Sequence, residues 1–133
     1  MTLAFSVPGV PPSVNRLLAA ARTVTPKDGR PSFVQHYTPA KHRDWCREVW
    51  AAFKAHYPGH RPLAGRAKVQ IELRFPTKRA TDIDNYAKAA LDALVQAKVL
   101  EDDSQIDELR LLRVPSAGKA LAMTRYEISE VTP

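Results

Sequence analysis

Apolar and polar residues alternate in four segments of the chain, and this period of two predicts four β-strands. The alternation is clearest at residues 67–75, where one face is apolar and the other is largely basic. Residues 3–7 alternate in the same way, over a shorter length. Two more strands are expected at about 105–114 and 120–129, joined by a hairpin turn that Gly118 favours.

Two other segments repeat their apolar residues at helical spacing. The first helix is expected to begin at a Thr38-Pro39 cap and to end before Pro58. Trp45 and Trp50 could serve as platforms for nucleobases, but their amphipathic spacing favours packing in the core or in a subunit interface. A second helix is expected from about Asp82 to Ala97, with Thr81 or Asp82 as its N-cap.

Residues 8–38 are rich in proline and basic residues and show weak periodicity, apart from one short helix expected at 17–22. Irregular stretches of this length are uncommon in compact domains and are often functional, which makes the segment a candidate arm for phosphates. The whole pattern predicts an α+β fold: a mostly antiparallel sheet of about four strands packed with two main helices, in a single domain at 1–133.

Length and composition limit the class of protein. A chain of 133 residues can bury one core without disulfides, and the single Cys46 excludes an intramolecular disulfide. A single cysteine favours a reducing compartment, here the cytoplasm. The N-terminal segment lacks the pattern of a signal peptide, and no stretch approaches the apolar length that spans a bilayer.

Charge is divided unevenly along a chain whose net charge is +6. Residues 1–81 carry a net +10, whereas residues 82–108 carry a net −6. A basic protein with one concentrated group of carboxylates is suited to attract a polyanion and to hold a divalent cation beside it.

The carboxylates stand at both ends of the second expected helix. Asp82 and Asp84 would lie at its positive end, while Asp102 and Asp103 follow it, where the helix dipole disfavours acids. An extended return after the helix is long enough to bring Asp103 back toward the first two. Three carboxylates suit Mg²⁺ or Mn²⁺, and Lys88 would neutralise charge on a phosphate, a combination that suits phosphodiester hydrolysis.

Plainer interpretations exist for several of these residues. Aspartate in a first helical turn is stabilising without any metal, and Asp92, four residues after Lys88, is interpreted as half of a surface ion pair. The four histidines show no zinc pattern and are interpreted as surface or core residues. Cys46 has no activating partner in the sequence and is interpreted as a small buried hydrophobe.

The chain resembles the RusA-type Holliday junction resolvases over most of its length. The likeness begins at Pro11-Pro12-Ser13-Val14-Asn15-Arg16 and is strongest from Asp82-Ile83-Asp84-Asn85 through Lys88 to Asp102-Asp103-Ser104-Gln105. The terminal segment at 110–130 also looks like that family's. Lys98 departs from the pattern, since many members have glycine where this helix ends.

This resemblance implies catalytic, metal-binding carboxylates at Asp82, Asp84 and Asp103, a catalytic Lys88, and a helper role for Asp102 as a further candidate metal ligand. It also implies a homodimer that nicks opposing strands of four-way junction DNA with Mg²⁺, for which Mn²⁺ would substitute. Two different interpretations stay open beside it. One is a non-catalytic DNA-binding protein, and the other is a nuclease that prefers flaps or other branched DNA.

DNA binding is expected to rest on phosphate contacts from basic and polar residues of the first half of the chain. The candidates are Asn15, Arg16, Lys27, Arg30, Lys68, Arg74, Lys78 and Arg79.

Overall fold

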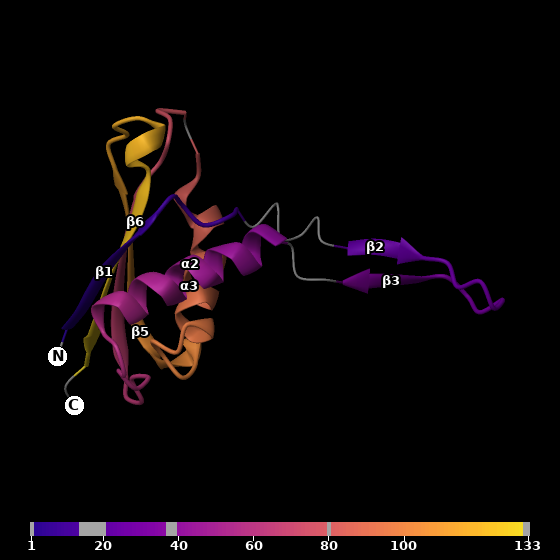
Figure 1. Ribbon diagram of the computed structural model, residues 1–133, viewed down its shortest axis with the longest axis horizontal. Coiled ribbons are helices and arrows are strands. Elements are labelled where there is room, and N and C mark those ends of the chain that lie inside the picture. The colour runs from indigo at the N-terminus through magenta and orange to yellow at the C-terminus, as the bar shows by residue number, and fades with distance from the viewer. Residues whose placement is uncertain (1, 14–20, 37–39, 80, 132–133) are drawn as a thin grey trace.

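A computed structural model describes residues 2–13, 21–36, 40–79 and 81–131. Its centre is a four-stranded mixed sheet in the order β1-β6-β4-β5, with β1 at Thr2–Pro8, β6 at Met123–Glu130, β4 at Ala67–Arg74 and β5 at Ile106–Val114. The helices α2 (Ala40–His56) and α3 (Ala87–Gln96) lie against the sheet and against each other (Figure 1). The expected α+β class is confirmed.

The sheet differs from the expected one in its pairing. β6 pairs antiparallel with both β1 and β4, but β5 pairs parallel with β4. The expected hairpin between the last two strands is therefore wrong, because β4 lies between them. Parallel neighbours need a crossover connection, and here it is formed by α3 and the turns on either side of it.

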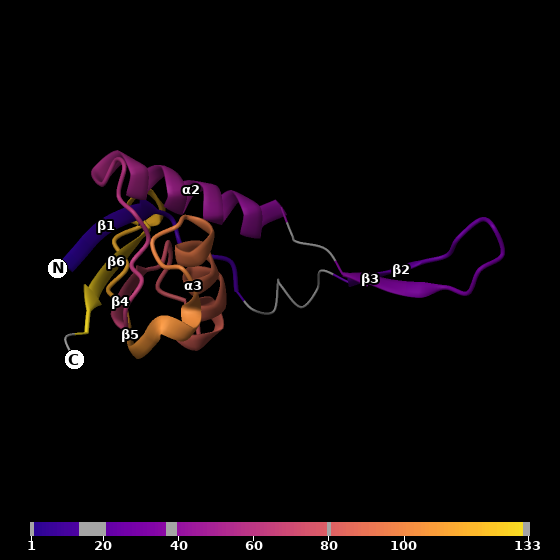
Figure 2. The same cartoon turned by 90° about the horizontal axis from the view of Figure 1, so that it is seen from below.

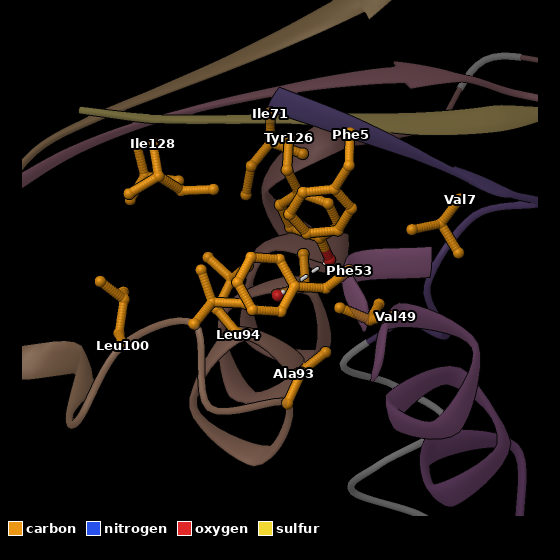
Figure 3. Packing of buried hydrophobic residues seen from close by; sticks show 14 of the residues in the cluster. Phe5, Val7, Val49, Phe53, Ile71, Ala93, Leu94, Leu100, Tyr126 and Ile128 are labelled. Atoms are coloured by element: carbon orange, nitrogen blue, oxygen red, sulfur yellow. Dashed lines mark hydrogen bonds between the residues drawn. The ribbon is translucent and has the colours of Figure 1, made fainter. Parts of the chain in front are cut away.

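The alternating strands bury one face, as their pattern predicted. On β4 the buried residues are Ala67, Val69, Ile71 and Leu73. In the core the Phe5 ring stacks on Tyr126 with centroids 5.2 Å apart, and Phe53 of α2 lies 5.4 Å from Phe5 (Figure 3). These contacts join β1, β6 and α2, so the sheet and the first helix share one hydrophobic core.

The opposite face of the sheet is less basic than expected. Acidic side chains stand among the cations: Lys68 pairs with Glu108 of the neighbouring β5 at 3.4 Å, and Arg125 pairs with Glu127 of its own strand, β6, at 3.1 Å. The charge of this face is therefore largely compensated.

The segment expected to be irregular contains a two-stranded sheet of its own. Strand β2 (Ala21–Val24) pairs antiparallel with β3 (Phe33–His36), and this hairpin projects away from the body of the molecule in Figure 1. The short helix expected at 17–22 is contradicted at residues 21 and 22, which lie in β2, and its remainder falls outside the described residues.

The first helix ends before Pro58 as expected, whereas the second is shorter as an α-helix than expected. The expected cap of the first helix, Thr38-Pro39, falls outside the described residues, and α2 ends at His56. Trp45 of this helix is buried, but Trp50 is 51% exposed, so packing in the core is wrong for Trp50, and its packing in a subunit interface stays a prediction. The second helix begins with a 3₁₀ turn, η1 (Ile83–Tyr86), whose N-cap is Asp82, as expected, although without a side-chain capping hydrogen bond. Tyr86 is the N-cap of the α-helical part, α3.

Lys98 ends α3 in the conformation that glycine favours. Its φ is 63°, and it is the one residue other than glycine with a positive φ in the described part of the chain. The Lys98 amide donates to Val95 and the Val99 amide donates to Leu94, which is the Schellman pattern of a helix end. Val99 and Leu100 are fully buried just beyond it. Their burial holds Lys98 in place despite its strain.

We expect Lys98→Gly to stabilise the protein by about 1 kcal/mol, because a Cβ in the left-handed region is strained and glycine is not. Urea unfolding measures this difference. Lys98→Ala is the matched control, since it removes the same charge and keeps the Cβ. Equal free energies of unfolding for the glycine and alanine variants would contradict the strain.

Candidate active site

The acidic residues lie at the two ends of the crossover between β4 and β5. Asp82 and Asp84 follow the C-terminal end of β4, whereas Asp102 and Asp103 precede the N-terminal end of β5. All four side chains are exposed.

The first end is held to the sheet by side chains that flank it. Arg113 of β5 donates hydrogen bonds to the carbonyl oxygen of Thr81 and to its hydroxyl, and its guanidinium lies 5.2 Å from the centre of the Phe75 ring. Tyr86 meets the same Phe75 ring edge to face at 4.9 Å. The 3₁₀ turn that carries Asp84 is thus clamped at both ends, and Asp82 projects from it without a capping hydrogen bond.

The middle of the crossover is fixed by a buried tyrosine. Tyr126 of β6 donates from its hydroxyl to the carbonyl oxygen of Ala90 at 3.0 Å, and burial raises the pKa of this phenol well above its ordinary value. Tyr126 therefore stays protonated and keeps α3 at a set distance from the sheet.

Lys88 lies on the exposed side of α3, with its ammonium 3.5 Å from Asp92 Oδ2. This is the ion pair that the spacing predicted. Asp92 is also approached by His42 of α2, whose Nε2 lies 3.9 Å from the same oxygen. Cys46 stands beside His42, and burial, followed by the charge of Asp92, raises the pKa of its thiol. A protonated, half-buried thiol agrees with its interpretation as a small hydrophobe.

The second end of the crossover is the 3₁₀ turn η2 (Asp103–Gln105), which has a complete capping box. The Asp102 carboxylate accepts hydrogen bonds from the hydroxyl and the amide of Ser104, and these bonds hold the pKa of Asp102 below its usual value. Gln105 is buried; its Oε1 accepts from the Asp102 amide, and its Nε2 donates to the carbonyl oxygens of Leu63 and Gly65 at 2.6 and 2.8 Å. The Asp102 carboxylate thus serves as a cap, while the Asp103 side chain beside it is exposed.

An open hollow of about 300 Å³ lies between this turn and the helices. It is lined by His42, Asp92, Val95, Gln96, Asp102 and Asp103. Asp103 therefore faces the second half of α3, whereas Asp82 and Asp84 stand before its first turn.

The return of Asp103 toward Asp82 and Asp84 is not found within one chain. Among the described residues, no three His, Cys, Asp or Glu side chains gather closely enough to hold a metal ion. The reason is the parallel pairing of β4 with β5, which places the start and the end of the crossover at opposite ends of these two strands. At about 1.5 Å per residue, η1 and α3 together span about 20 Å. The catalytic and metal-binding roles of these residues stay predictions.

The donor chemistry of the exposed acids fits a hard divalent cation. With the residues that the structure describes, Asp82, Asp84 and Asp103 form no ion pair, so their oxygens are open to an incoming cation. Mg²⁺ is usually bound through one or two carboxylates, with waters and substrate phosphates as its other ligands. Either end of the crossover meets that requirement.

The expected DNA-binding residues are spread over the molecule. Asn15 and Arg16 fall outside the described residues. Lys27 and Arg30 are exposed in the loop at the tip of the β2–β3 hairpin, where Arg30 pairs with Asp28 at 2.7 Å. In the sheet, Lys68 is paired with Glu108, and Arg74 is half-buried with one guanidinium hydrogen bond at 3.8 Å to Met123 Sδ.

Lys78 and Arg79 are exposed just ahead of Asp82, in the loop that follows β4. They are the predicted phosphate contacts that stand nearest in sequence to the acids. Their DNA-binding role, like that of the other candidates, stays a prediction.

Comparison with known proteins places this arrangement in a family. The model of the family described as "Endodeoxyribonuclease RusA" matches residues 8–123, a range that includes the whole crossover and both groups of acids. The chain belongs to the RusA family.

Curated RusA relatives share a shorter stretch with the chain. Proteins named "Crossover junction endodeoxyribonuclease RusA" from Escherichia coli K12 and from Enterobacteria phage 82 are 39% and 37% identical to it over 67 residues. A protein of the same name from Enterobacteria phage HK97 is 34% identical over 65 residues. The match spans about half of this chain and 54 to 56% of the relatives' own length.

The hollow at the second end of the RusA crossover contains two residues that the sequence interpretation set aside. Asp92 does form the predicted ion pair, but it also lines the same hollow as Asp103, and so does His42. The four-residue spacing of Lys88 and Asp92 had indicated that these two side chains lie on one face of the second helix, and Asp92 of that face lines this hollow. No sequence pattern marked His42, because its approach depends on how α2 packs on α3.

In the described part of this RusA-family chain, no helix is both long and apolar enough to cross a membrane.

Gln105 anchors the turn that carries Asp102 and Asp103, so Gln105→Ala is expected to destabilise the protein by about 2 kcal/mol or more. The substitution leaves the Leu63 and Gly65 carbonyl oxygens without their donor. Urea unfolding gives the free-energy difference. Gln96→Ala, an exposed glutamine of α3, is the control and should lie within about 0.5 kcal/mol of the wild type. Equal stability of the two variants would show that Gln105 is no anchor.

Proposed function

We propose that the protein is a divalent-metal-dependent endodeoxyribonuclease that resolves four-way DNA junctions by paired, symmetric nicks, in DNA recombination and repair. The observation that carries this proposal is the RusA family match, which covers the crossover and both of its acidic ends. The choice of a DNA junction as substrate rests on the relatives' name, crossover junction endodeoxyribonuclease. Relatives in phages and bacteria support action in the cytoplasm of a bacterial or phage-infected cell.

Asp82, Asp84 and Asp103 would hold Mg²⁺, which Mn²⁺ would replace, and Asp102 is the further candidate ligand. Such a cation, when bound, supplies charge neutralisation at the phosphate and an activated water for hydrolysis. The capping bonds of Asp102 favour a supporting role, since its carboxylate already accepts from Ser104.

Lys88 would act on the phosphate from the exposed side of α3. Its ammonium reaches Asp92 at 3.5 Å, and both side chains retain solvent contact, 64% for Lys88 and 30% for Asp92. An exposed ion pair of this kind contributes little to stability, so the ammonium can move to a phosphate at small cost. There it would neutralise the charge that develops on the phosphate and leaving oxygens.

A homodimer is part of the proposal, and the separation of the acids gives it a physical reason. Within one chain, Asp82 and Asp84 lie at the opposite end of α3 from Asp103. In an isologous dimer two such helices can run in opposite directions, so that the first end of each crossover meets the second end of its partner. Each of the two sites would then take Asp82 and Asp84 from one protomer and Asp103 from the other.

Asp82→Asn and Asp103→Asn are each expected to lower the rate of junction nicking by at least about 100-fold, because each removes a charged ligand. The measurement is nicking of a fixed four-way junction in Mg²⁺, with product mapping on all four strands and binding followed separately. Glu101→Gln, an exposed acid beside the second end, is the matched control and should keep the wild-type rate.

Wild-type protein that binds the junction but leaves it intact in both Mg²⁺ and Mn²⁺ would favour the non-catalytic DNA-binding protein instead. Faster cleavage of a flap than of the four-way junction would favour the other branched substrates.

The shared sites can be tested by mixing the two inactive variants under conditions that exchange subunits. If the sites are shared, a heterodimer of Asp82→Asn and Asp103→Asn protomers contains one site with both wild-type residues. Nicking activity should therefore return, mainly as single nicks. Sites contained within one chain would leave the mixture as inactive as its components, and that result would refute the shared arrangement.

A further inference from the structure

The solvent side of α2 is divided by charge into two flanks. Residues 43, 47, 50 and 54 recur at spacings of four, three and four, which places them on one face of the helix. That face, which we name the Trp50 flank, consists of Arg43, Arg47, Trp50 and Lys54 and contains no acid. The acids of the helix lie on the other flank, where Asp44 and Glu48 line a separate hollow with Lys41.

Trp50 is a large apolar side chain that is exposed to solvent in this structure. Its exposed fraction is 51%, against 5% for Trp45 of the same helix. The buried face of α2 is already filled by Trp45, Val49 and Phe53, so Trp50 has no core position to occupy. In Figure 2, α2 lies along the edge of the body, and its outer side is free of the other described elements. Proteins that bind single-stranded nucleic acid combine cations along the backbone with aromatic rings on which bases stack, and the Trp50 flank has both kinds of side chain.

Two cations of the flank, Arg47 and Lys54, have weak partners. Arg47 is 79% exposed and approaches Asp44 only at 3.9 Å, a surface contact of small energetic worth. Lys54 has its ammonium 5.6 Å from the centre of the Phe53 ring. Both side chains can turn to a phosphate without leaving a buried charge unpaired.

The Trp50 flank is continuous with the second end of the crossover. A hollow of about 350 Å³ beside the flank is lined by His42, Arg43, Cys46, Arg47 and Gln96. His42 and Gln96 also line the hollow that contains Asp103. From residue 43 to residue 54 the flank measures about 16 Å at 1.5 Å per residue, which matches about five nucleotide steps at 3.4 Å.

We infer that the Trp50 flank binds a DNA strand with unpaired bases, whose phosphates lie against Arg43, Arg47 and Lys54 while Trp50 stacks on a base. This inference rests on the proposed nuclease function. It identifies the DNA strand that would extend from the site at Asp103 along α2. Stacking on Trp50 needs an open base face, which the interior of a duplex does not present. The flank therefore selects a branch point, a frayed end or a single strand over continuous duplex.

The stacking is tested by tryptophan fluorescence and binding with an unlabelled single-stranded oligonucleotide and a blunt duplex of the same length, without divalent metal. The single strand should quench the wild-type emission, and the quenching should disappear in Trp50→Leu, which keeps an apolar side chain without a flat ring. Affinity for the single strand should fall about tenfold in this variant, while affinity for the duplex changes little. Equal quenching by the duplex and the single strand would overturn the inference.

The phosphate contacts are tested by salt dependence. Arg47→Gln should reduce the slope of log K against log salt by about 0.7 for the single strand. Lys41→Gln is the control, because it removes one exposed charge from the opposite flank of the same helix, and its slope should equal the wild-type slope. Equal slopes for Arg47→Gln and Lys41→Gln would overturn the phosphate contacts.

These outcomes separate the inference from the proposed function. If wild-type protein nicks junctions while Trp50→Leu and Arg47→Gln bind DNA as the wild type does, the flank is not a DNA surface and the nuclease proposal stands. If the wild type fails to nick but the variants lose single-strand binding, the flank is supported and the nuclease proposal fails. A change of oligomeric state on sedimentation of Trp50→Leu would assign the flank to a second copy of the chain and overturn the inference.

Discussion

The parallel pairing of β4 with β5 is the constraint on which the rest of the structure depends. Two parallel neighbours cannot be joined by a tight turn. The chain must leave the C-terminal end of β4 and return to the N-terminal end of β5, at the opposite end of the strands. The four acids Asp82, Asp84, Asp102 and Asp103 all lie on this connection, within the range that the family model matches. The pairing that completes the sheet therefore also sets how far apart those acids stand within one chain.

The crossover is held at three points, each by a different kind of interaction. Arg113 ties its first end to β5, the buried hydroxyl of Tyr126 ties its middle to β6, and Gln105 ties its second end to the loop before β4. None of these side chains belongs to the predicted site. They are polar groups that satisfy backbone carbonyl oxygens, and the acidic side chains remain exposed because these other residues carry the structure.

Local sequence patterns predicted most of the helices and strands, but they did not predict how the strands pair. The alternation on β4 and the apolar spacing on α2 identify their buried faces directly, because burial repeats with the period of the backbone. The order of the strands depends on contacts between distant segments, and a Gly118 turn looked the same whether or not its flanking strands pair. The expected return of Asp103 to Asp82 was a separate error: chain length permits the return, but the parallel pairing of β4 with β5 does not produce it. The position of His42 was equally unreadable, since it depends on one helix packing on another.

The β2–β3 hairpin carries a thermodynamic consequence. It pairs four residues with four, and a two-stranded sheet of this size is marginal in water when nothing covers it. A partner that contacted it would supply part of the free energy that keeps the strands paired. Heat capacity and enthalpy of such an association, measured on the whole chain, would then contain a folding component from this hairpin, added to that of the contact surface itself.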